Sequence, residues 1–435
     1  MSILISVIIF GVIIFIHEFG HFIMAKKNGI YVVEFSIGMG PTLFKFKKGE
    51  TVYALKALPL GGACQMLNKE MADMDIEGAD YERAFETKSV WARMVVIAAG
   101  PVFNFVLAFV LALIVIGFAG YDIPEVLIVS NGSAAQDAGL MEGDIIVKYN
   151  GKKVDLSREV YLQQYIHPVS DEEIELTVLR DGEKIDLTIE PKETKRYALG
   201  ISYTADDNEA VIAEVADEGA AMEAGIEAGD VILAINDDEI ANGSELNQYL
   251  SRNPLTEDEI EILIKRDGEE IIKTVSPSYS GELYVAGFSY NLARTEAKGL
   301  SVIKYSFAEV KYQIVQVFES LAMLFKGQLT VNDFTGPVGI ADIIDDVYEQ
   351  SESGGFKAIF LNFANFTIML SANLGVMNLL PIPGLDGGRL LFLIYEAIVG
   401  KPVKKEEYIH LAGLLLLMLF AFYIMFKDIV SCIRS

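Results

Sequence analysis

The N-terminal 25 residues place the strongest constraint on what this chain can fold into. Sixteen uncharged residues (MSILISVIIFGVIIFI) run directly into His17-Glu18-Phe19-Gly20-His21. An apolar run of about 20 residues is long enough to cross the ~30 Å hydrocarbon core of a bilayer. Ionisable side chains in such a helix are costly to bury and usually have a function. We therefore expect a membrane helix that carries functional residues, with a polar cap at the headgroups as the alternative.

Three more segments have the length and apolar character of membrane spans. The four expected spans cover about residues 3–25, 95–118, 358–380 and 408–426. The first has no basic segment and no small-residue cleavage site ahead of its charged motif, so we expect it to be retained rather than removed as a signal peptide. The sequence thus predicts a polytopic α-helical membrane protein with four transmembrane helices.

Charge is concentrated in one part of the chain. The formal net charge is -26, although 52% of the residues are hydrophobic. Residues 121–357 hold 46 acidic and 19 basic residues, whereas the flanks hold 15 and 16. An acidic soluble insert between membrane segments explains this division. The acidity argues against a nucleic-acid partner, because phosphate binding needs clustered Lys and Arg.

Basic residues gather in the two loops that the positive-inside rule assigns to the cytoplasm. They are Lys26, Lys27, Lys45, Lys47, Lys48, Lys56, Lys69, Arg83, Lys88 and Arg93 in the first loop, and Arg389, Lys401, Lys404 and Lys405 in the second. Both termini and the acidic insert then lie outside, and in a bacterium the chain lies in the cytoplasmic (inner) membrane. The motif at 17–21 and Asp386 fall at the same depth, near the cytoplasmic side.

His17 and His21 have the i, i+4 spacing that puts two imidazoles on one face of a helix. Zinc fits these ligands best, and Glu18 beside them can accept a proton from a water held at the metal. Such a site needs a third protein ligand. Asp386 is the candidate, because a carboxylate in the membrane must be paired or metal-bound to be tolerated. Taken alone, Asp386 has the alternative role of a turn residue at a helix end.

Five short motifs occur in a fixed order along the chain. They are HEFGH (17–21), FSIGMGP (35–41), LPLGG (58–62), AGPVFN (99–104) and NLLPIPGLDGG (378–388). In these motifs the chain resembles the site-2 protease family of intramembrane zinc metalloproteases, of the bacterial regulator-of-sigma-E type. The resemblance implies Zn2+ as cofactor, His17, His21 and Asp386 as its ligands, and Glu18 as the catalytic acid/base. It also implies contacts to substrate from Asn373, Asn378, Pro381 and Pro383, and a GxxxN element at Gly100 and Asn104, where simple helix packing is the alternative.

Residues 31–67 alternate in places (TVYALKAL), which predicts a strand pair that returns toward the site. In the resembled family such a strand pairs with the unfolded substrate segment, which implicates Gly61 and Gly62 in substrate binding. Relatives usually follow LPLGG with an aromatic residue, Val and Lys, whereas this chain has Ala63-Cys64-Gln65. We therefore expect backbone pairing with substrate to be kept and side-chain contacts to differ.

The acidic insert contains an internal repeat with an offset of 86 residues. SAAQDAGLMEGDIIVKYNGKKV (133–154) aligns without gaps with GAAMEAGIEAGDVILAINDDEI (219–240). The shared pattern resembles PDZ domains, which are small β-rich folds that bind extended peptides or substrate tails at a strand edge. We expect an inserted pair of PDZ domains, with a structural spacer as the alternative for at least one of them.

The expected division of the chain follows from these segments. It is 1–120 for the first membrane part, 121–204 and 205–291 for two PDZ domains, 292–357 for a lid and linker, and 358–435 for the second membrane part. Residues 299–328 predict an amphipathic lid helix on the outer membrane surface, which GPVGIA (336–341) would anchor. Cys64 and Cys432 predict no disulfide framework, and His167 and His410 are expected to be a surface and a packing residue.

The resulting prediction is an intramembrane zinc metalloprotease that acts in regulated intramembrane proteolysis and stress response. Its expected substrates are single-pass membrane proteins of the anti-sigma-factor type, with signal-peptide remnants as a second class. A non-proteolytic PDZ scaffold and a metal-ion transporter are the alternatives. The complete set of ligands argues against the scaffold, and the lack of an inverted repeat of broken spans argues against the transporter.

Overall fold

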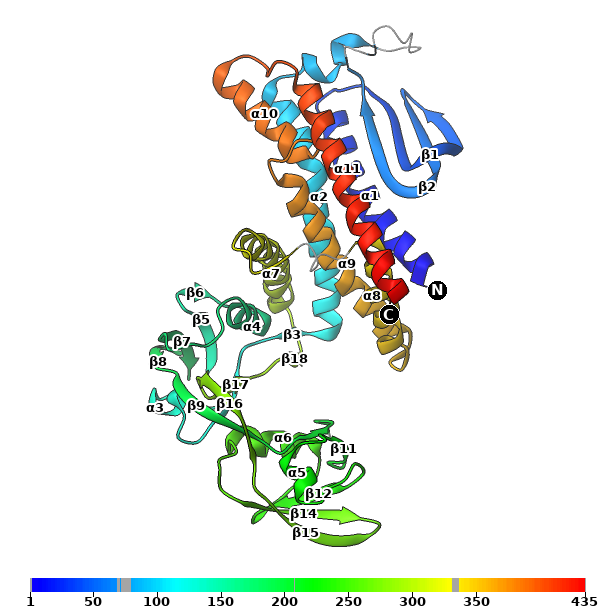
Figure 1. Cartoon of the computed structure of the whole chain (residues 1–435). Coiled ribbons are helices and arrows are strands. Elements are labelled where there is room, and N and C mark those ends of the chain that lie inside the picture. Colours follow the sequence, from blue (N-terminus) through cyan, green and yellow to red (C-terminus); the bar gives the residue numbers. More distant parts are fainter. Residues whose placement is uncertain (1, 69–70, 72–79, 207, 331–335, 435) are drawn as a thin grey trace. The chain divides into compact units, whose positions relative to one another are not determined.

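The computed structural model describes residues 2–68, 71, 80–206, 208–330 and 336–434. The chain divides into two compact units (Figure 1). The membrane unit joins Met1–Gly120 to Glu296–Ser435, and the inserted unit comprises Tyr121–Thr295.

Four helices of the described chain are long and apolar enough to cross a membrane, at the places of the four expected spans. They are α1 (Ser2–Lys27), α2 (Val90–Ala119), α9 (Gly355–Leu379) and α11 (Glu406–Arg434). Helix α2 begins where the Ser89 hydroxyl accepts the Ala92 amide, and it ends at Gly120, whose positive φ of 78° suits glycine. The coarse part of the expected fold class, long apolar helices together with β-rich regions, is therefore confirmed.

The described part of the membrane unit has three further α-helices. They are α7 (Leu300–Phe325), α8 (Pro337–Glu352) and α10 (Asp386–Val399). Helix α7 occupies the predicted amphipathic segment, with Leu300 and Phe307 exposed and Val310 buried. Helix α8 begins within GPVGIA, which was expected to be a linker, and α10 was not foreseen at all because its apolar stretch is shorter than a span.

Helix α9 packs against the other helices on two sides. With α2 and α7 it shares a core of small and β-branched residues, namely Ala108, Ala112, Val115, Val310, Ala364, Ile368 and Ala372. With α1 and α8 it shares a second core, namely Ile9, Ile13, Ile344, Phe363 and Phe366. Small side chains let helix backbones approach closely in a membrane protein. The C-terminal end of α9, which leads to Asp386, is thereby held against α1 and α2.

Strands β1 (Val32–Lys48) and β2 (Thr51–Met66) form the predicted strand pair. Both strands bend, so Glu34 pairs with Gln65 on one side and with Val52 on the other. The pair thus makes a small sheet in which residues 62–66 form one edge. The Glu50 carboxylate at its turn accepts bonds from Arg83 (2.6 and 2.9 Å) and Lys26 (2.5 Å). The Arg83 bond, and then Lys26, hold the pKa of Glu50 below its usual range despite partial burial.

The sequence repeat is also a repeat of structure within the inserted unit. The first copy has the sheet order β6-β5-β7-β8, built from Ile145–Tyr149 (β5), Lys152–Lys153 (β6), Ile174–Arg180 (β7) and Glu183–Ile189 (β8). The second has the order β13-β12-β14-β15, built from Val231–Ile235 (β12), Asp238–Glu239 (β13), Ile260–Arg266 (β14) and Glu269–Val275 (β15). Each copy adds two helices, α3 (Ala134–Asp137) with α4 (Ser157–Ile166), and α5 (Ala220–Glu223) with α6 (Gly243–Arg252).

Each copy gains one more strand pair, and the first copy takes a strand from beyond the second. In the second copy β10 (Ile201–Tyr203) pairs with β11 (Ile212–Val215). In the first, β4 (Val126–Val129) pairs with β17 (Phe288–Tyr290). The structure therefore places residues 288–290 in the first copy, although the expected range 205–291 assigns them to the second. Strands β9 (Lys192–Ala198) and β16 (Ser278–Val285) pair antiparallel and connect the first copy to the second and back again. Strand β3 (Tyr121–Asp122) pairs with β18 (Arg294–Thr295).

Candidate metal centre

Helix α1 presents both histidines on the face that packs against α2. The side chains of His17 and His21 are largely buried, with relative exposures of 9% and 6%, and their rings meet edge to face. The two Nε2 atoms lie 3.2 Å apart. The helical spacing read from the sequence thus brings two nitrogen donors together in a nearly dry environment.

Asp386 reaches the same place from the other end of the chain. Helix α9 ends at Leu379, a tight turn follows, and Asp386 is the first residue of α10. A Cβ on Gly387 would lie 2.2 Å from the carbonyl oxygen of Leu380, so only glycine lets α10 begin directly over that turn. The Asp386 Oδ2 atom lies 3.1 Å from Nε2 of His17 and 3.2 Å from Nε2 of His21.

The three donor atoms form a nearly equilateral triangle that fits zinc. A tetrahedral ion with bonds of about 2.0–2.1 Å separates its ligand atoms by roughly 3.3–3.4 Å, close to the observed spacing. Among the described residues, this is a cluster of His and Asp ligands able to hold a metal ion. Oδ2 of Asp386 has no hydrogen-bond partner in the described part of the chain, which is costly for a buried carboxylate unless a cation is shared.

Hydrogen bonds on the far side of each ring orient the imidazoles. Nδ1 of His21 donates to the Val96 carbonyl at 2.9 Å, which leaves the Nε2 lone pair for a metal. The Nδ2 atom of Asn104 lies 3.3 Å from Nδ1 of His17, and Oδ1 of Asn104 has no partner among the described residues. If this carboxamide turned by 180°, its oxygen would accept the Nδ1 hydrogen, gain a partner and free Nε2 of that ring as well.

Two glycines allow α1 and α2 to approach at this point. A Cβ on Gly100 would lie 2.3 Å from Nε2 of His21 and 2.8 Å from Cε1 of His17. A Cβ on Gly20 would lie 2.4 Å from the carbonyl oxygen of Ala99. Gly100 and Asn104 of the expected GxxxN element therefore both lie beside His17 and His21.

The edge of the β-sheet contacts Glu18. The Cys64 amide donates to Oε2 of Glu18 at 2.9 Å, so the outer edge of residues 62–66 faces α1. A Cβ on Gly62 would lie 2.9 Å from Cγ of Glu18, so glycine is needed for this approach. Gly61 has a positive φ of 78° and packs against Met39. Sequence reasoning missed the bond between Cys64 and Glu18, because nothing in a strand pattern shows which edge it presents.

The remaining residues expected to contact substrate lie around the end of α9. Asn373 and Asn378 are on α9 and partly buried, and Pro381 is exposed in the turn that follows. Pro383 packs against α11, where a Cβ on Gly413 would lie 2.0 Å from its carbonyl oxygen. On α11, Nδ1 of His410 accepts the Gly384 amide at 3.0 Å. His410 therefore fixes the turn that carries Asp386, a more specific contact than the packing role expected for it.

Comparison with known proteins places the chain in a family. The family model for peptidase family M50 matches residues 5–420. The chain is 29% identical to the regulator of sigma-W protease RasP of Bacillus subtilis, over 97% of each chain. It is 30% identical to a putative zinc metalloprotease of Clostridium acetobutylicum, over 99% of this chain and 97% of that protein. It is also 30% identical to the zinc metalloprotease RasP of Geobacillus kaustophilus, over 98% and 97%.

The chain belongs to peptidase family M50, the site-2 proteases. It is a zinc metalloprotease, and its four apolar helices make it a bacterial membrane protein. Intramembrane proteolysis by a zinc enzyme is thus its general activity, as the motifs predicted.

Proposed function

We propose that His17, His21 and Asp386 hold the zinc ion and that Glu18 is the catalytic acid/base. The observation that carries this assignment is the triangle of Nε2, Nε2 and Oδ2 atoms at 3.1–3.2 Å, formed by residues more than 360 positions apart. When bound there, zinc acts as a Lewis acid on the scissile carbonyl and lowers the pKa of a water molecule. The Val96 carbonyl keeps the Nε2 lone pair of His21 available, and Asn104 would do the same for His17 with its oxygen turned to Nδ1.

Glu18 performs the proton transfers in this proposal. It follows His17 directly, so its carboxylate is carried to the side of the cluster that faces the sheet edge. The Cys64 amide holds one of its oxygens, and the other takes the proton of the attacking water in this proposal. Glu18 then gives that proton to the leaving amine. A positioned acid/base of this kind contributes roughly 10²–10⁴-fold to the rate.

The substrate segment binds in an extended form along residues 62–66. Peptide carbonyls are hidden in a helix, so a transmembrane segment must unwind before it can be cut. The outer edge of these residues already donates an amide toward the cluster, which supports β-augmentation by the unwound segment. Ala63, Cys64 and Gln65 need only their backbones for this pairing. Asn378 and Pro381, beside the turn that carries Asp386, contact the segment from the other side.

The proposed substrates are single-pass membrane proteins of the anti-sigma-factor type. The resemblance to site-2 proteases and a relative that regulates sigma-W support this class. The two repeats of the inserted unit are proposed to be PDZ domains that bind or exclude extracytoplasmic tails of the substrate, because they share the PDZ sequence pattern and a common strand order. The basic loops support an orientation with the metal centre near the cytoplasmic side of the inner membrane.

The test compares Glu18→Gln with the wild type in vesicles that contain a tagged single-pass substrate. We expect Glu18→Gln to keep its zinc, measured by elemental analysis, and to lose cleavage by at least 10²-fold. His167→Gln, a change on the surface of the inserted unit, is the matched control and should cleave normally. Cleavage by Glu18→Gln at the wild-type rate would exclude the proposed acid/base. If neither protein cleaves while both keep zinc, the scaffold alternative gains.

A further inference from the structure

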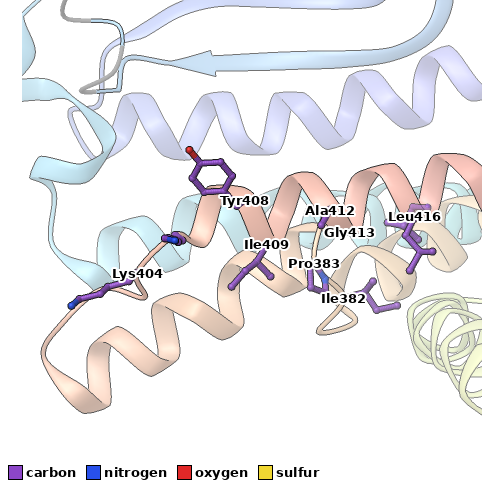
Figure 2. Close-up of a pocket in the computed structure, with 10 residues that line it drawn as sticks. Ile382, Pro383, Lys404, Tyr408, Ile409, Ala412, Gly413 and Leu416 are labelled. Carbon is purple, nitrogen blue, oxygen red and sulfur yellow. The ribbon is translucent and has the colours of Figure 1, made fainter.

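A groove runs along α11 beside the turn that precedes Asp386. It has a volume of about 650 Å³ and is lined almost wholly by apolar side chains of α11, together with Ile382 and Pro383 of the turn. Figure 2 shows Lys404 at one end of the groove and Leu416 toward the other, with Pro383 between them. Lys405 and Tyr408 also line it. The groove is thus basic at one end and apolar along its length.

The position of the groove in the membrane follows from α11 itself. The candidate span begins at Glu406, so Lys404 and Lys405 lie at the membrane surface and the remaining lining lies within the hydrocarbon. Only 6% of the most apolar window of α11 is buried inside the protein, the lowest share of the four spans. Of the four candidate spans, this helix therefore offers the largest share of its surface to lipid. From Lys405 to Leu417 the groove extends about 18 Å at 1.5 Å per residue, close to the ~15 Å depth of one leaflet.

Charge distinguishes this groove from an ordinary lipid-facing surface. Within the described part of the chain, neither Lys404 nor Lys405 has an ion-pair partner within 4.0 Å. Glu406 in the same turn is directed to His410, with its Oε1 atom 3.7 Å from Nε2, and neither Glu406 nor the adjacent Glu407 lines the groove. Two ammonium groups at the surface end of an apolar channel complement a phospholipid that has an anionic headgroup.

We propose that this groove binds one anionic phospholipid, with the phosphate at Lys404 and Lys405 and an acyl chain along Ala412 and Leu416. The bound acyl chain contacts Pro383, whose turn is fixed to α11 by the bond from the Gly384 amide to His410. The lipid would thus support the loop that carries Asp386. The proposal does not depend on proteolytic activity, because binding is measured without substrate.

The experiment uses full-length protein in detergent and native mass spectrometry. Wild-type protein is offered equal amounts of phosphatidylglycerol and phosphatidylcholine, and in a second arm phosphatidylglycerol with excess inorganic phosphate. We expect one retained phosphatidylglycerol, little phosphatidylcholine and no displacement by phosphate. The double variant Lys404→Gln/Lys405→Gln should bind phosphatidylglycerol about 30-fold more weakly, since each interfacial lysine contributes roughly fivefold.

Two matched controls make the result specific. Lys27→Gln/Lys401→Gln removes the same charge from exposed lysines outside the groove and should bind lipid like the wild type. Ala412→Trp fills the apolar part of the groove and should also lose the lipid, whereas Leu419→Trp places the same side chain on an exposed position of α11 outside the groove and should bind lipid like the wild type.

Three outcomes overturn the proposal. Equal retention of the two lipids would show that the lysines do not select an anionic headgroup, and equal loss in both lysine variants would show a diffuse charge effect. Retention of neither lipid by the wild type would assign the groove to another occupant, such as a helix of a substrate or of a second copy.

Discussion

Gly100→Ala tests the geometry of the metal centre with the smallest possible change. The added Cβ would lie 2.3 Å from Nε2 of His21 and 2.6 Å from its Cε1 atom. Non-bonded heavy atoms pack at about 3.5 Å, so the ring or the helix would have to move by roughly 1.2 Å. Metal–ligand distances tolerate about 0.2 Å, so the displaced ring no longer meets the requirement for a zinc ligand.

We expect the zinc affinity of Gly100→Ala to fall at least 10–100-fold, and cleavage to fall with it. The assay is competition for zinc with a chelator of known affinity, read by elemental analysis of the purified protein. Gly117→Ala is the matched control, because it makes the same change in the same helix where the nearest atom, on Val302, is 4.0 Å from the added Cβ. Replacing glycine by alanine within a helix otherwise favours the helix by up to about 1 kcal/mol.

The reasoning fails if Gly100→Ala binds zinc with the affinity of the wild type. Retained affinity would mean that α1 and α2 can separate by about an ångström without loss of the ligand geometry. It would also make the contact between Gly100 and the imidazoles incidental. A fall in affinity in both Gly100→Ala and Gly117→Ala would point to a general effect on α2 instead.

Three other outcomes follow from the structure. Asp428 accepts the Gly336 amide at 2.8 Å and so caps the N-terminus of α8. Asp428→Ala should therefore destabilise the start of α8 by about 1–2 kcal/mol, and amide exchange should become faster in α8 but not in α2. The pKa of Asp230 is lowered mainly by its bonds to Arg266. This pair therefore stabilises the second repeat above about pH 4, and the stabilisation is lost as the pH falls through the lowered pKa. In thermal melts, Asp230→Asn should unfold at a lower temperature than the wild type at pH 7 and should lose that acid dependence. Removal of metal by a chelator should abolish cleavage, and zinc should restore it where magnesium does not.

Much of the membrane unit could be predicted from the sequence because its features are properties of short, continuous segments. Span length is a property of one segment, so all four spans were predicted within a few residues. The i, i+4 histidines need only helical geometry, and the alternation in TVYALKAL was enough to predict the strand pair. Asp386 was reached by matching its depth in the membrane with that of the histidines, and the structure brings the three side chains together.

The parts that were missed depend on contacts between distant segments. Helix α10 is too short for a span, and its start is defined by packing over the Leu380 carbonyl. Strand β17, which joins the first repeat, lies some 160 residues after its partner β4, and no local pattern shows that pairing. The bond from the Cys64 amide to Glu18 depends on which edge of the sheet faces α1. Tertiary context alone decides features of this kind.

The glycines of the motifs have one physical purpose in this structure. At Gly20, Gly100 and Gly387 an added Cβ would lie 2.2–2.4 Å from a carbonyl oxygen or an imidazole nitrogen. Each glycine thus lets two segments approach until backbone meets backbone or ligand. Three such contacts bring donors from α1 and α10 within 3.2 Å of one another in a largely dry place. A buried carboxylate and two imidazoles are best tolerated when they share a cation, so the proposed zinc site would depend on the same close backbone packing.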